Sequence, residues 1–336
     1  MSVLGQCLTS ANLDPKWKVF PSILESKHVS IVPVGNSEST HYFSLEHDGI
    51  SLALAEKVVK LERRTLIIVE PRSVHPEQFR KNVRDKYGKI IALSRRHLNE
   101  SMGEIWEGGH LATPPAVIAE VMKSQQLVRK PNTVGLINEN KFSLIAGSQY
   151  KKRYLVINEF LDNGHEFSLA GKDWDRGLVW TIAKQIHSAI RALSARVIPD
   201  LRESHLPMRV KSKNLKYFGR VDSQFDFLRT LQFAIVIENE ANYVTEKLLN
   251  AVIAGCVPLF FGPPLSEFGI PDDVAIQING LNESFYDGMQ NCSCEKIDQI
   301  ILKGREWITS PSTLERWGVL SGFERLASRI EELSVG

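Results

Sequence analysis

The chain has 336 residues, of which 43% are hydrophobic and 24% are charged, and its formal net charge is +2. This composition excludes an intrinsically disordered chain, and so mild a charge excludes a protein built chiefly to bind nucleic acid. The length exceeds what one hydrophobic core usually serves, so we expect two domains.

The first half alternates short apolar runs with helical patterns, which predicts parallel strands joined by crossover helices. The predicted strands are VSIVPV (29–34), TLIIVEP (65–71) and KIIALS (89–94), with a helical period over 51–63. Residues 123–140 are polar and lose all periodicity. We therefore interpret them as the linker between an N-terminal domain, 1–130, and a second domain, 141–310.

The second half repeats the alternation of strands and helices. Its apolar runs are FSLIAG (142–147), EFSLAG (166–171), LKYFG (215–219), FAIVIEN (233–239) and VPLFFG (257–262). Helices are predicted over 153–164, ending at Gly164, and over 178–193. Apolar residues from Trp317 to Leu333 recur every three or four positions, so we expect residues 311–336 to form an amphipathic helix that packs on the body.

The sequence also bears on the compartment. The cysteines, which show neither a CxxC pair nor a zinc-ligand spacing, are Cys7, Cys256, Cys292 and Cys294. No export signal opens the sequence, and no window is apolar over the roughly 18 residues that a membrane-spanning helix needs. We therefore expect a cytoplasmic protein without a transmembrane segment, and leave a peripheral membrane contact open.

The chemistry is concentrated where the FAIVIEN strand ends in Glu238 and Asn239, because open α/β sheets bind ligands beyond the carboxyl ends of their strands. Thr245 can cap the helix that follows, with Glu246 and Lys247 in its first turn. The helix dipole and the lysine favour a diphosphate there, and the glutamate could accept hydrogen bonds from ribose hydroxyls. The alternative is an ordinary surface helix start.

The stretch ENEANYVTEKLLNAVIAGCVPLFFGPP, residues 238–264, resembles the signature of the α-1,3-fucosyltransferase family, glycosyltransferase family 10. In that family a tyrosine, a glutamate and a lysine of the motif line the GDP-sugar site. The counterparts here are Tyr243, Glu246 and Lys247, with Asn239 nearby. Glu240 replaces the family's usual serine, which puts the local donor contacts in doubt.

The resemblance also implies a phosphate-binding arginine at a helix start, which corresponds to Arg153, with Lys151 and Lys152 as neighbouring alternatives. Solvated basic residues are the other interpretation. The resemblance covers about two thirds of the chain. Residues 175–213 have no clear counterpart in the family, and we interpret them as an insertion. The basic run of Arg209, Lys211, Lys213 and Lys216 is either a solvated face or a contact for an anionic partner.

A glutamate before Pro71, Glu70, matches the residue that the family uses as general base, and Glu77 and His75 are the local alternatives. A structural role for Glu70 is the other interpretation, because glutamate-proline dipeptides are common.

Within this family, the missing membrane anchor favours a bacterial-type enzyme that is cytoplasmic, with a peripheral contact to the inner membrane left open. Its fold would be GT-B, two Rossmann-like domains facing a central cleft, with the acceptor domain first. It would be inverting and would need no metal or other cofactor. Its partners would be GDP-fucose and a glycan acceptor such as N-acetylglucosamine in a lipopolysaccharide precursor, and no nucleic acid.

Two other functions stay open on the sequence. Asp173 and Asp175 form a D-x-D pair that could hold a metal on the diphosphate of another nucleotide sugar, although a turn beside two glycines explains them as well. A non-catalytic protein that binds nucleotide sugars or glycans is the second alternative. A dinucleotide-dependent oxidoreductase is disfavoured, since no GxGxxG follows a predicted strand. The sequence leaves the oligomeric state undetermined.

Overall fold

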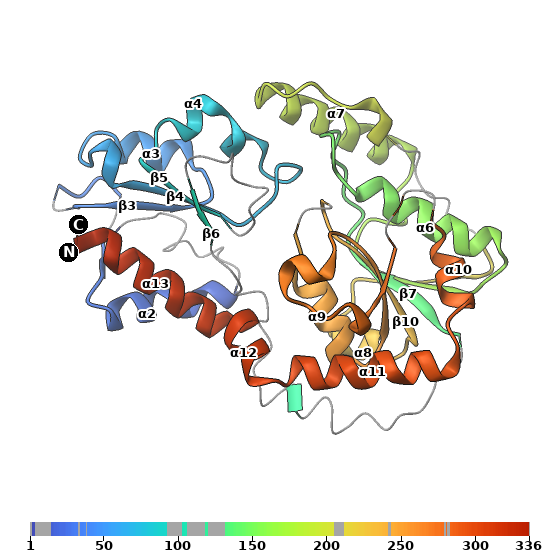
Figure 1. Cartoon of the computed structure of the whole chain (residues 1–336). Coiled ribbons are helices and arrows are strands. Elements are labelled where there is room, and N and C mark those ends of the chain that lie inside the picture. The colour runs from blue at the N-terminus through green and yellow to red at the C-terminus, as the bar shows by residue number, and fades with distance from the viewer. Residues whose placement is uncertain are drawn as a thin grey trace. The chain divides into compact units, whose positions relative to one another are not determined.

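The chain folds into two compact units in a computed structural model (Figure 1). The structure describes residues 2–3, 15–32, 34–37, 39–92, 103–105, 118–119, 132–204, 212–240, 243–278, 280 and 283–335. The N-terminal unit comprises Met1–Ala112 together with Leu314–Gly336, and the C-terminal unit comprises Thr113–Thr313. The end of the chain therefore belongs to the unit in which the chain begins.

The N-terminal unit contains a parallel sheet in which the strands follow one another in chain order. These strands are β3 (Tyr42–Leu45), β4 (Arg64–Ile68), β5 (Lys89–Ala92) and β6 (Gly103–Ile105), and a separate parallel pair joins β1 (Ser2–Val3) to β2 (Ser30–Ile31). Its helices are α2 (Phe20–Ser26), α3 (Gly49–Ala55), α4 (Lys81–Arg84) and α13 (Val319–Val335), the last preceded by α12 (Pro311–Trp317).

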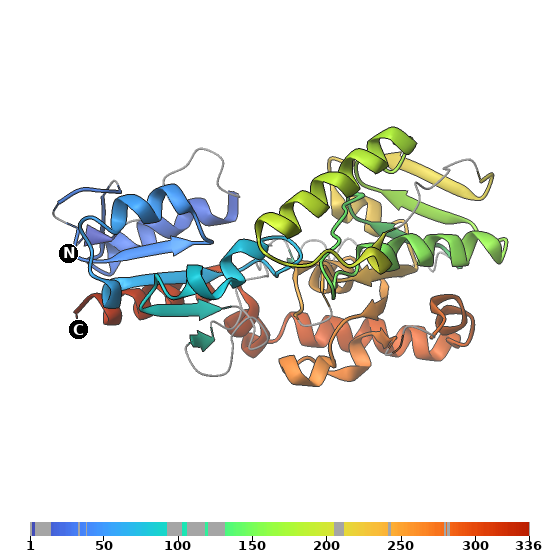
Figure 2. The same cartoon turned by 90° about the horizontal axis from the view of Figure 1, so that it is seen from above.

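Helices cover both faces of this sheet, because successive side chains of a strand point to opposite sides. Phe43, Ile67 and Ile91 pack with α2 and with Phe323 of α13 on one face. The intervening residues of the same strands pack with Leu52 of α3 on the other (Figure 1 and Figure 2). Phe323, Leu326 and Ile330 give α13 a buried apolar face.

The C-terminal unit contains a six-stranded parallel sheet of order β12-β11-β10-β7-β8-β9. The strands are β7 (Val134–Ile137), β8 (Phe167–Ala170), β9 (Leu215–Gly219), β10 (Phe233–Ile237), β11 (Val257–Phe261) and β12 (Ile276–Gln277). The helices are α6 (Tyr150–Asp162), α7 (Leu178–Ser194), α8 (Gln224–Leu228), α9 (Glu246–Ile253), α10 (Phe285–Gln290) and α11 (Cys294–Ile308). Two parallel sheets with crossover helices confirm the predicted α/β class.

Several predicted elements need correction. The supposed linker contains β7, the central strand of the second sheet, whereas the FSLIAG run at 142–147 is a loop. The run at 29–34 gives only the short strand β2, and the helix predicted over 51–63 ends at Ala55. Gly164, with φ of +73°, follows the end of α6 as predicted. Arg209 and Lys211 of the basic run lie outside the described residues.

Candidate functional site

The order of the second sheet marks one place where the chain reverses direction across it. β7 and β10 are neighbours, but the chain continues from β7 outward to β8 and from β10 outward to β11, on the opposite side. Connections that diverge in this way open a crevice at the carboxyl ends of the two strands, and open α/β sheets bind ligands there. Glu238 and Asn239 follow β10 at this point.

Two helices begin at the same loop. Gln149, which precedes α6, donates its backbone N–H to the carbonyl of Asn239 at 2.9 Å, and Ser148 forms an isolated antiparallel bridge with Glu240. Thr245, further along the loop, precedes α9. The first turns of both helices are thereby fastened to the segment that leaves β10, and helix N-termini favour anions.

A buried carboxylate organises the start of α9. Glu238 is fully buried, and its carboxylate accepts from the backbone N–H of Thr245 at 2.8 Å, the Thr245 hydroxyl at 2.8 Å and the Lys247 ammonium at 3.0 Å. The same ammonium donates to the threonine hydroxyl at 2.9 Å. Thr245 is the N-cap residue of α9, as predicted, but its hydroxyl binds Glu238 and makes no capping hydrogen bond.

Arg153 lies in the first turn of α6 and is 2% exposed. Its Nη2 donates to the Ile237 carbonyl at 3.1 Å and to Oδ1 of Asn239 at 2.8 Å. Because the amide oxygen of Asn239 accepts from the guanidinium, its NH₂ group is the end left for a ligand. Burial lowers the pKa of Arg153, and the nearby Tyr150 and Glu238 oppose that shift.

The side chains of Lys151 and Lys152, the two alternatives to Arg153, contact other parts of the unit. Lys151 donates to the carbonyl of Arg202, and the ammonium of Lys152 lies 5.1 Å from the ring centroid of Phe261. The structure thus brings Arg153, of the three, to the loop after β10.

The predicted residues divide by exposure into two groups. Glu238, Thr245, Tyr243 and Arg153 are buried. Asn239 is half-buried, and the side chains of Lys247 and Glu246 are 18% and 43% exposed. The more exposed residues can touch a ligand, and the buried residues hold the exposed ones in place. The cations Arg153 and Lys247 are balanced by the carboxylates of Glu238 and Glu246, so the helix N-termini at this loop, and not an excess of positive charge, are what favours an anion.

The D-x-D pair lies in the loop after β8. Trp174 between the two aspartates is 1% exposed and donates its ring N–H to the Asn138 carbonyl at 2.6 Å, and Asp173 pairs with Arg176 at 3.1 Å. Gly171 makes this packing possible, since a Cβ there would lie 1.9 Å from the Asn138 carbonyl oxygen. The described residues hold no cluster of three His, Cys, Asp or Glu side chains arranged for a metal.

The N-terminal unit contributes a second polar cluster at the carboxyl ends of β3 and β4. Glu70 follows β4 and is half-buried, as are its alternatives His75 and Glu77. Its backbone N–H donates to Oε1 of Glu46 at 2.7 Å, and its carbonyl accepts from Gln78 at 3.1 Å.

Sequence reasoning missed Glu46, because β3 was not predicted. Oε1 of Glu46 also accepts from the Val69 N–H at 2.6 Å, while Oε2 is buried without a partner among the described residues. Burial raises the pKa of Glu46 to about 7, the hydrogen bonds from the Glu70 and Val69 amides oppose this rise, and the charge of the nearby Glu70 carboxylate adds a little to it. Glu46 also lies in the left-handed region of the backbone, with φ of +60°. Such a backbone conformation and a carboxyl with a shifted pKa at strand ends are both typical of functional sites.

Two Rossmann-like units are the parts of the GT-B fold, and solved glycosyltransferases share this fold with the chain. HepE of Anabaena, solved with UDP and glucose, is 11% identical with a TM-score of 0.56, over 99% of this chain and 100% of that one. An α1,3-fucosyltransferase solved with GDP is 9% identical with a TM-score of 0.54, over 100% and 90%. A UDP-forming trehalose-phosphate synthase from Burkholderia vietnamiensis is 11% identical with a TM-score of 0.53, over 97% and 82%.

At these identities the likeness shows the fold alone. No protein-family profile matches the chain, and no characterised protein matches its sequence, so membership of the fucosyltransferase family is not confirmed. Within the described residues, no helix is both long and apolar enough to cross a membrane.

Proposed function

We propose that the chain is an inverting glycosyltransferase that moves L-fucose from GDP-fucose to a hydroxyl of a glycan acceptor such as N-acetylglucosamine, without a metal. One observation carries the proposal. Asn239, Glu246 and Lys247 reach the surface together at the switch point of the second sheet, above the buried cluster of Arg153 and Glu238. The motif in this loop resembles that of fucosyltransferases, and an α1,3-fucosyltransferase with GDP shares the fold.

Each surface residue has a role that its chemistry suits. Lys247 and the first amides of α9 hold the diphosphate, Glu246 accepts from the ribose hydroxyls, and Asn239 donates through its NH₂ group. Tyr243, Thr245, Glu238 and Arg153 keep that loop in shape from beneath. Fixed positive charge at the departing diphosphate stabilises the transition state.

The reaction forms one bond and breaks one. The acceptor oxygen bonds to the anomeric carbon as the bond from that carbon to the diphosphate oxygen breaks, and the configuration inverts. The acceptor proton passes to the Glu70 carboxylate, and the electron pair leaves with GDP. Glu46 accepts a hydrogen bond from the backbone N–H of Glu70 and thereby fixes the backbone position of Glu70.

The test is a transfer assay with the purified protein. GDP-fucose, GDP-mannose and UDP-glucose are each offered with acceptors ending in N-acetylglucosamine, with and without a chelator, and products are read by mass spectrometry. We expect fucosylated product that resists the chelator, and its loss in Glu70→Gln but not in Glu77→Gln. Product only with metal would establish the D-x-D alternative, and nucleotide-sugar binding without any product would establish a binding protein.

A further inference from the structure

The segment that follows β4, residues 70–86, carries more cations than carboxylates. Its charged residues are the cations Arg72, Arg80, Lys81, Arg84 and Lys86 and the carboxylates Glu70, Glu77 and Asp85. Lys81 pairs with Asp85 at 2.8 Å, and the Lys86 ammonium lies 3.4 Å from a carboxylate oxygen of Glu56. Three arginines and two glutamates of the segment therefore remain.

Arg84 is a buried cation close to the backbone of Glu70. It is 8% exposed, its guanidinium carbon lies 5.0 Å from the ring centroid of Phe79, and its Nε donates to the Gln78 carbonyl at 3.2 Å. The side-chain amide of Gln78, which is fully buried, donates to the Glu70 carbonyl at 3.1 Å. A guanidinium keeps its charge in proteins, so a fixed positive charge lies behind the loop that carries Glu70.

Arg72 brings a second positive charge to this loop. It is exposed, it follows Glu70 by two residues, and no hydrogen bond or ion pair joins its guanidinium to another residue that the structure describes. Burial lowers the pKa of Arg84, and the charge of Arg72 lowers it further, so the two guanidinium groups are close enough to repel each other. An anion bound at Arg72 would offset this repulsion.

The other charges of the segment act on His47, which follows β3. Burial lowers the pKa of His47, and the carboxylates of Asp48 and Glu77 oppose this effect. The cations Lys86 and Arg80 increase it, so two carboxylates and two cations act on this imidazole. The charges of Glu77 and Arg80 are therefore balanced at the end of β3.

The end of β4 differs, because cations exceed charged carboxylates there. Burial raises the pKa of Glu46 to about 7, so this carboxyl does not carry a full charge near neutral pH. Arg72 and Arg84 then lie beside a single fully charged carboxylate, Glu70. Guanidinium groups bind phosphates and carboxylates through paired N–H donors, so this end of the sheet suits a ligand with an anionic group.

We infer that the acceptor is an acidic glycan, and that Arg72 binds its phosphate or carboxylate group, with Arg84 behind it, while a neighbouring hydroxyl meets Glu70. The inference rests on the proposed function, because it names the class of acceptor for that transfer. A neutral glycan at the same place lacks the charge-assisted contact to Arg72.

The test is transfer from GDP-fucose to three acceptors: the methyl glycoside of N-acetylglucosamine, N-acetylglucosamine 1-phosphate, and N-acetylglucosamine linked to glucuronic acid. We expect kcat/KM to be about tenfold higher for at least one acidic acceptor than for the neutral one, and added salt to reduce this ratio. The acidic acceptor that is preferred tells a phosphate site from a carboxylate site.

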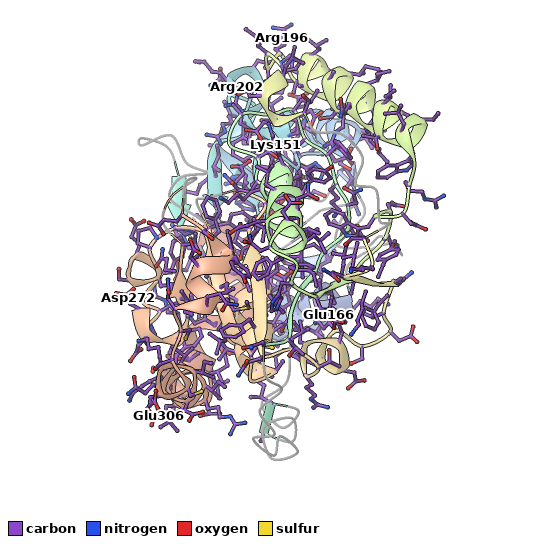
Figure 3. The ribbon with its side chains drawn as sticks, turned by 90° about the vertical axis from the view of Figure 1, so that its right-hand side faces the viewer. Lys151, Glu166, Arg196, Arg202, Asp272 and Glu306 are labelled. Atoms are coloured by element: carbon purple, nitrogen blue, oxygen red, sulfur yellow. The ribbon has the colours of Figure 1, made fainter. Side chains whose placement is uncertain are left out.

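Arg72→Gln should bring the ratio of acidic to neutral kcat/KM to about one. Arg196→Gln is the matched control and should keep the ratio, because Arg196 is also an exposed arginine, and Figure 3 shows it at the surface of the C-terminal unit. Equal kcat/KM for neutral and acidic acceptors would overturn the inference. So would a preference that Arg72→Gln keeps or that Arg196→Gln also removes.

Saturation-transfer NMR with the same acceptors separates this inference from the proposed function, because it needs no turnover. Binding of an acidic acceptor that is lost in Arg72→Gln and kept in Arg196→Gln supports the anion site, and if no acceptor is fucosylated, the proposed transfer alone fails. Binding of neither acidic acceptor overturns the anion site.

Discussion

Replacing Glu46 by glutamine tests whether this carboxyl is held away from water. Its pKa is raised from 4.5 to about 7 in the folded protein, chiefly by burial. A carboxyl whose pKa rises on folding binds more protons in the native state than in the unfolded state between those two values. The free energy of unfolding therefore falls as pH rises through this window, and the loss is complete above pH 7.

The magnitude follows from the size of the shift. At 1.36 kcal/mol for each pKa unit, the shift from 4.5 to about 7 corresponds to about 3 kcal/mol. Glutamine keeps an oxygen to accept from the Val69 and Glu70 amides but carries no charge. We expect Glu46→Gln to match the wild type well below pH 4.5 and to exceed its free energy of unfolding by about 3 kcal/mol well above pH 7.

The assay is urea unfolding of both proteins at the two pH extremes, with hydrogen exchange over residues 64–70 to follow the N-terminal unit itself. The low-pH comparison is the internal control, because both side chains are then neutral. A difference that does not change between the two pH values would refute the reasoning that burial holds this carboxyl protonated.

Three further variants test the C-terminal unit. Lys247→Met leaves the Glu238 carboxylate buried with one partner fewer and should lower the free energy of unfolding by about 3 kcal/mol in urea, and adding Glu238→Gln should restore part of it. Gly171→Ala places a Cβ 1.9 Å from the Asn138 carbonyl oxygen at φ of +123°, so we expect a loss of several degrees in melting temperature. Asn239→Ala should weaken GDP binding about tenfold in calorimetry, and it should also lower the free energy of unfolding by about 1–3 kcal/mol, because it removes an acceptor from the buried Arg153 guanidinium.

Each of these variants has its own contrary outcome. A wild-type unfolding curve for Lys247→Met would mean that the carboxylate does not depend on the ammonium. An unchanged melting temperature for Gly171→Ala would mean that the loop after β8 does not need a glycine. Unchanged GDP affinity in Asn239→Ala would remove that side chain from the donor site.

The strand-helix-strand unit around the site was predictable because its local signals agree. All five residues of β10 and all five of β11 are buried, as an unbroken apolar run predicts, and Gly255 ends the intervening segment at φ of +74°. β7 was missed because it is four residues long and contains Gly135, a poor strand former. That glycine is required by a tertiary contact, since a Cβ there would lie 2.4 Å from the Ser168 carbonyl oxygen.

Two features of the structure depend on contacts that a sequence does not display. The period of α7 predicts a helix but not which side is buried, which the bond between Ser188 and the Leu144 amide decides. Glu46 resembles any polar residue after a short apolar run until the fold brings the amides of Val69 and Glu70 to it. The candidate donor residues could be proposed from the sequence because several of them are adjacent in it.

The central claim, that a nucleotide diphosphate binds where α9 begins, is tested most directly by calorimetric titration of GDP, UDP and their sugars into the protein. We expect saturable binding of GDP and GDP-fucose that is lost in Glu246→Ala and kept in Glu306→Ala, whose side chain is exposed on α11. Absence of binding by every nucleotide, or equal binding by the two variants, would contradict the account.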